Sequence, residues 1–100
     1  MEFGLQDNDI KEIKTVFASF RNIDQVVLFG SRALGRHKPG SDIDFAISGS
    51  NLTFNEILEI SNRLEDLGMF YSFDIQNMAS IKDSALIDHI QRVGKVFYKA

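Results

Sequence analysis

The sequence predicts an α/β (α+β) protein in which helices pack on a small mixed β-sheet. Short apolar runs bounded by glycine or polar residues alternate with longer segments whose apolar residues recur every three or four positions. Hydrophobic residues make up 44% of the 100 residues and nine are phenylalanine, so the chain can bury one core. We therefore expect a single domain over residues 1–100.

Charge and composition narrow the classes of function. The net charge is −3 and the pI is near 5.2, whereas proteins that hold long nucleic acids are usually basic. The chain contains no cysteine, which excludes disulfides and fits the cytoplasm. No apolar stretch approaches the length of a membrane-spanning helix. We therefore expect a cytoplasmic protein without a membrane or a long nucleic acid as partner.

The first part of the chain is expected to form a helix, a strand and a second, short helix. Asp9 followed by Glu12 has the spacing of a capping box, and the helical apolar pattern continues to about Phe20. The β-branched and aromatic run at residues 25–29 predicts a buried strand. A short helix is expected over residues 31–34, before the next glycine.

The middle of the chain is expected to form a strand–helix–strand unit. A strand over residues 42–48 is followed by a helix with Thr53 as N-cap and Glu56 as its capping-box partner. Gly68 is expected to stop this helix, and the next strand covers residues 70–76. Because such crossovers are right-handed and join parallel strands, this strand should run parallel to the preceding one.

The last part of the chain is expected to add a helix and an edge strand. Ser80 is the expected N-cap of the helix, which continues to about Arg92 and is ended by Gly94. Residues 95–99 then alternate in the way of a short strand, and their terminal lysines suit the edge of a sheet.

One motif lies between the first two predicted strands. A Gly30-Ser31 turn is followed, ten residues later, by Asp42-Ile43-Asp44 at the start of a strand. Side chains two apart on a strand share a face, so the two carboxylates should lie side by side and raise each other's pKa. Mg²⁺ would relieve this repulsion, since it binds one or two carboxylates together with substrate phosphates. The glycine turn offers backbone amides to a phosphate.

At this spacing the motif resembles the signature of the DNA polymerase β-like nucleotidyltransferase superfamily. The motif is most similar to that of its minimal nucleotidyltransferases, the MntA-like proteins often paired with a HEPN-domain protein. The residues that carry this similarity are Gly-Ser-Arg-Ala-Leu-Gly…Ser-Asp-Ile-Asp-Phe. The resemblance implies that Gly30, Ser31 and Arg32 bind the triphosphate. It also implies two Mg²⁺ ions held by Asp42, Asp44 and a third acidic residue.

Asp74 is the candidate for that third acidic residue. A carboxylate within an apolar strand is costly unless it is paired or bound to metal, although it could simply end the strand. By the resemblance, Asp74 would be the general base and a metal ligand. Family members commonly carry a second arginine where this chain has Leu34. Arg36 or Lys38 could replace that charge, or they could form an exposed polar loop together with His37, and their roles stay open.

The resemblance implies an enzyme, an Mg²⁺-dependent nucleotidyltransferase. It would move a nucleoside monophosphate, AMP from ATP, to a hydroxyl of a partner protein, because 100 residues leave little surface to hold an acceptor. A HEPN toxin is the implied partner, with this chain as its antitoxin. Two alternatives are a binding module that masks the toxin without turnover and a transferase acting on a small molecule. Hetero-oligomer and homodimer both remain open.

Overall fold

The computed structural model describes residues 2–100 and contains one four-stranded mixed sheet. The strand order is β3-β2-β1-β4, and β1 lies antiparallel to both β2 and β4. The predicted parallel pairing is present between β2 and β3. The strands are β1 (Ile23–Phe29), β2 (Ile43–Gly49), β3 (Phe73–Asn77) and β4 (Lys95–Lys99).

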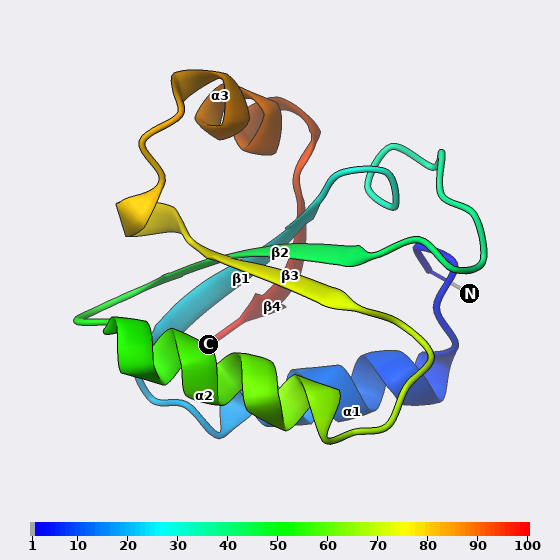
Figure 1. Ribbon diagram of the computed structural model, residues 1–100, viewed down its shortest axis with the longest axis horizontal. Helices are drawn as coiled ribbons and strands as arrows, with labels where there is room; N and C mark the ends of the chain where they lie inside the picture. The colour runs from blue at the N-terminus through cyan, green and yellow to red at the C-terminus, as the bar shows by residue number, and fades with distance from the viewer. Residues whose placement is uncertain (1) are drawn as a thin grey trace.

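Three helices cover the two faces of the sheet, which confirms the predicted fold class (Figure 1). Helices α1 (Asp7–Ala18) and α2 (Phe54–Glu65) lie on one face, and α3 (Ser84–Val93) lies on the other. No helix of residues 2–100 is both long and apolar enough to cross a membrane.

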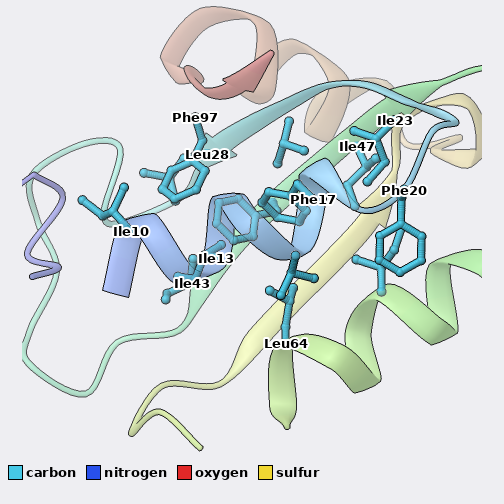
Figure 2. Packing of buried hydrophobic residues seen from close by; sticks show 14 of the residues in the cluster. Ile10, Ile13, Phe17, Phe20, Ile23, Leu28, Ile43, Ile47, Leu64 and Phe97 are labelled. Atoms are coloured by element: carbon cyan, nitrogen blue, oxygen red, sulfur yellow. The ribbon is translucent and has the colours of Figure 1, made fainter. Parts of the chain in front are cut away.

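The main core fills the space between the sheet and helices α1 and α2. Figure 2 shows Phe17 of α1 among the side chains of this core. The Phe17 ring lies edge-on to the ring of Phe45 of β2, with 5.1 Å between the ring centres. Each such side chain, fully buried, contributes about 1.5–3 kcal/mol. A smaller cluster on the opposite face joins Phe29, Ala46 and Ile90, and it attaches α3 to the sheet.

Two predictions for the first part of the chain are wrong in detail. Helix α1 begins at Asp7, and its N-cap Gln6 makes no side-chain capping bond, so Asp9 lies inside the first turn. Residues 31–34 form a single turn, because Gly35 at φ 72° ends it at once. The Arg36 amide donates to the Ser31 carbonyl at 2.9 Å and closes the turn.

The second half of the chain differs from prediction at the capping box of α2 and at the starts of β3 and α3. Thr53 accepts a hydrogen bond from the Glu56 amide at 3.1 Å as predicted, but the Glu56 carboxylate accepts from Asn22 and does not close a capping box. Strand β3 starts at Phe73, since its partner β2 starts only at Ile43.

The N-cap of α3 is Asp83, whose Oδ1 accepts from the Ala85 amide at 2.9 Å. Ser80 instead ends a 3₁₀ turn, Met78–Ser80, which Asn77 caps. The predicted end of this helix near Arg92 and the edge strand at 95–99 are confirmed.

Candidate functional site

The structure places Asp44 and Asp74 on the face of the sheet that carries α3, and Asp42 lies just before the strand that carries Asp44. Asp44 of β2 and Asp74 of β3 are direct partners in the parallel register, and Asp42 lies two residues before Asp44. The neighbours of Asp44 in β2, Ile43 and Phe45, are fully buried in the core on the opposite face. Because side chains alternate along a strand, Asp44 points away from α1 and α2.

The environment of Asp44 raises its pKa from 3.8 to about 6. Partial burial, which penalises the charged form, is the largest cause, and repulsion from Asp74 and then Asp42 adds to it. The positive charge of the Arg32 guanidinium acts in the opposite direction. Asp44 is therefore a carboxylate that a cation would stabilise in its ionised form.

The Gly30-Ser31 turn lies directly beside Asp44. Gly30 has φ 76°, and a side-chain carbon at this position would collide with Oδ2 of Asp44. Within residues 2–100 the amides of Ser31, Arg32 and Ala33 have no hydrogen-bond partner. The turn thus places backbone donors next to the carboxylates, a combination suited to an anion that arrives with a cation.

Arg32 does not face this site in the structure. Its side chain is only 2% exposed, and its guanidinium donates to the carbonyls of Phe3 at 2.8 Å and of Ser41 at 2.9 Å and 3.2 Å. The guanidinium carbon also lies 4.9 Å from the centre of the Tyr71 ring. Arg32 therefore ties the N-terminal segment to the residue before Asp42, and triphosphate binding by Arg32 stays a prediction.

His89 belongs to the site but was not found by reasoning from the sequence. Its Nε2 accepts a hydrogen bond from the Gly30 amide at 3.3 Å, and its ring packs edge-on against Phe29. The contact joins residues 59 positions apart. A single histidine on a predicted helix carries no signal that would reveal such a contact.

The donor set fits a divalent cation in its chemistry, although the side chains do not yet converge as ligands. Three carboxylates supply the hard oxygens that Mg²⁺ prefers. Among residues 2–100, however, no three His, Cys, Asp or Glu groups stand close enough together to hold an ion. Asp74 is exposed, and its Oδ1 accepts a hydrogen bond from Gln76 Nε2 at 3.2 Å.

Among residues 2–100, the basic residues after the turn form no ion pair with the three carboxylates. Arg36 and Lys38 are exposed, and His37 packs against Gly4, with its Nδ1 buried and without a partner among residues 2–100. A groove of about 510 Å³ lies between α1 and Tyr98, and none of the three carboxylates lines it.

Comparison with known proteins agrees with this geometry. The model of the family Polymerase beta, Nucleotidyltransferase matches residues 11–100. No curated protein matches the sequence.

Among solved structures, the chain resembles a toxin–antitoxin with AMP-PNP, with a TM-score of 0.74 at 22% identity over 96% of this chain and 75% of that one. It also resembles the toxin–antitoxin MntA-HepT, with a TM-score of 0.71 at 18% identity over 95% and 74% of the two chains. A third similar structure is a tri-AMPylated Shewanella oneidensis HEPN toxin in complex with MNT antitoxin, with a TM-score of 0.71 at 18% identity over 96% and 74%.

Proposed function

Because this chain belongs to the Polymerase beta, Nucleotidyltransferase family, we propose that it transfers AMP from ATP to a hydroxyl group of a HEPN-domain partner protein. The observation that carries this proposal is the register pair Asp44 and Asp74 beside the Gly30-Ser31 turn. Family members generally use divalent metal ions. A solved neighbour holds AMP-PNP and another contains an AMPylated HEPN toxin, which supports ATP as the donor and a HEPN protein as the acceptor.

Asp42, Asp44 and Asp74 would hold the metal, two Mg²⁺ ions in our proposal. Bound Mg²⁺ neutralises charge on the phosphates and on the carboxylates during an in-line displacement. The elevated pKa of Asp44, caused by burial and by its two acidic neighbours, shows that this position is unfavourable for a bare negative charge. These residues are therefore suited to accept a cation with the nucleotide.

The remaining residues would bind and orient the reactants. The hydroxyl of Ser31 and the amides that follow Gly30 donate to oxygens of the β- and γ-phosphates. Asp74 accepts the proton of the acceptor hydroxyl. The acceptor oxygen then forms a bond to the α-phosphorus, the bond from the α-phosphorus to the bridging oxygen breaks, and pyrophosphate leaves. Gln76 fixes one oxygen of Asp74 by hydrogen bonding to it.

Arg32 would act on the nucleotide through the shape of the loop. Its guanidinium holds the Ser41 carbonyl, adjacent to Asp42, from the N-terminal side of the same loop that carries Ser31. The acceptor would come from the partner, which places donor, enzyme and toxin in the cytoplasm, where ATP is available.

The decisive experiment follows label from α-labelled ATP into a purified HEPN-domain protein encoded next to this chain. Wild-type protein with Mg²⁺ is compared with the double variant Asp42→Asn/Asp44→Asn. A matched control, Glu59→Gln/Glu65→Gln, removes two exposed charges from α2 on the opposite face of the sheet.

Label on the partner with wild type and the control, and none with the double variant, supports the proposal. If the partner stays unlabelled with every nucleotide and still binds both wild type and the double variant, the chain masks its partner without catalysis. If label moves instead to a small hydroxyl compound, the partner part of the proposal is wrong.

A further inference from the structure

The backbone amide of Gly30 donates a hydrogen bond to the side chain of His89 in α3. His89 Nε2 lies 3.3 Å from this amide nitrogen and accepts its hydrogen. Since a backbone N–H can only donate, Nε2 carries the lone pair and the ring proton sits on Nδ1. This hydrogen bond joins α3 to the turn beside Asp44, on the face of the sheet opposite α1 and α2 (Figure 1).

Packing of Ile90 and Phe29 fixes the position of His89. Ile90, the next residue, is 4% exposed and packs with Phe29 and Ala46. The imidazole itself packs edge-on against Phe29, with ring centres 6.1 Å apart and planes at 81°. The imidazole is therefore held in place by packing that does not depend on its hydrogen bond.

The Gly30 amide lies beyond the end of the β1–β4 ladder and needs an acceptor from elsewhere. Strand β4 pairs with β1 only as far as Leu28 opposite Lys95, so its ladder ends two residues before Gly30. Gly30 adopts φ 76°, a region that glycine enters without strain but also leaves readily. A fixed acceptor on its amide restricts this peptide plane, and through it the direction of the Ser31 amide.

We propose that His89 is a positioning residue: its imidazole Nε2 holds the Gly30 amide so that the free amides of Ser31, Arg32 and Ala33 face the triphosphate. The inference rests on the proposed function for the identity of the ligand. In this role His89 acts through the Gly30 amide, by ordering the turn before the nucleotide binds.

Two substitutions of His89 distinguish the effect of its hydrogen-bond acceptor from the effect of its aromatic ring. His89→Phe keeps an aromatic ring against Phe29 and removes the acceptor, whereas His89→Gln offers an acceptor oxygen at similar reach. Binding of ATP with Mg²⁺ is measured by calorimetry, and the kcat and KM of AMP transfer are measured alongside it. The Gly30 amide is followed by ¹⁵N NMR in the nucleotide-free protein, which reports the hydrogen bond whether or not ATP binds.

We expect His89→Phe to weaken ATP binding and raise KM about fivefold with little change in kcat, as for the loss of one hydrogen bond. His89→Gln should return both values to within about twofold of wild type. In NMR, the Gly30 resonance should move in His89→Phe and move back in His89→Gln. These results together support the inference.

Two results would overturn it. Equal ATP affinity in wild type and His89→Phe would mean that the turn needs no support, and tighter binding by His89→Phe would mean that His89 competes with phosphate for the amide. In both cases the proposed function stands if wild type still transfers AMP to its partner, which the kcat measurement shows independently. If wild type binds no nucleotide even with its partner, the proposed function fails and the inference fails with it, whatever the Gly30 resonance shows.

Discussion

Asp44 of β2 and Asp74 of β3 are register partners, so two carboxylates face the same side of a parallel strand pair. With no cation between them, they repel, and burial adds to the cost. Sheets usually avoid like charges directly opposite each other, because the arrangement destabilises the pair. The site is thus built at the expense of stability, a pattern expected where a ligand supplies the missing charge.

The first prediction concerns the stability of the metal-free protein. The pKa of Asp44 is raised in the fold to about 6, so folding favours its protonated form, and this contribution to stability is lost as pH rises from about 4 to above 6. Asp44→Asn should therefore gain stability relative to wild type as pH rises. We expect the gain at pH 7.5 to exceed that at pH 4.5 by about 1 kcal/mol, since solvent screens part of the shift.

Urea unfolding of both proteins at the two pH values, with a chelator present, measures this difference. Asp88→Asn serves as the control, because Asp88 is exposed in an ion pair with Arg92. A gain that is the same at both pH values would show that Asp44 titrates normally in the fold.

The second prediction concerns Mg²⁺. An ion bound only by the folded chain, at ten times its Kd, stabilises it by about 1.4 kcal/mol. This stabilisation should be smaller at pH 5 than at pH 7.5, because protons compete for Asp44. Thermal unfolding with and without Mg²⁺ tests it. Asp42→Asn/Asp44→Asn should lose the effect, and Glu59→Gln/Glu65→Gln should keep it; an effect of equal size in all three proteins would place the ion elsewhere.

Sequence patterns were enough to predict the helices and strands that short-range rules specify. The helical periodicity of α1 and α2, the apolar run of β1 and the parallel course of β3 all follow from short-range rules. The same rules were less useful where a helix start depends on which of two residues caps it. Ser80 and Asp83 are both good N-caps, and the 3₁₀ turn that ends at Ser80 leaves the role to Asp83.

The candidate site shows the same division. The Gly30-Ser31 spacing to Asp42 and Asp44 located the region, because a local motif encodes it. The direction of a long side chain is set by what the fold packs around it, and Arg32 turns toward the carbonyls of Phe3 and Ser41. The contact between His89 and Gly30 joins residues 59 positions apart, and no local motif encodes it.

The third prediction compares two glycines with similar backbones. Gly30 and Gly35 have φ of 76° and 72°, so replacing either by alanine should cost about 1 kcal/mol of stability from backbone strain. A new side-chain carbon meets Asp44 at Gly30 but nothing within 4 Å at Gly35. Gly30→Ala should therefore displace the Asp44 carboxylate and abolish transfer, while Gly35→Ala stays active.

Chemical denaturation and label transfer measured on the same preparations decide this prediction. Loss of activity in both variants to the same degree would mean that backbone strain, and not the position of Asp44, controls the reaction.

The fourth prediction separates two roles of Arg32. A lysine carries its donors on one nitrogen and cannot reproduce the contacts that three arginine nitrogens make with the carbonyls of Phe3 and Ser41, and a buried carbonyl without a donor is costly. Arg32→Lys should therefore lose about 2–4 kcal/mol of stability, whereas Arg36→Lys at an exposed position should change it by less than about 0.5 kcal/mol. Urea unfolding gives both values.

Calorimetry below the unfolding transition then measures ATP binding. If Arg32 acts only by holding the loop, the affinity for ATP with Mg²⁺ should fall together with the stability. If Arg32→Lys keeps wild-type stability and loses only affinity for ATP, the guanidinium leaves its carbonyl partners and binds the triphosphate directly.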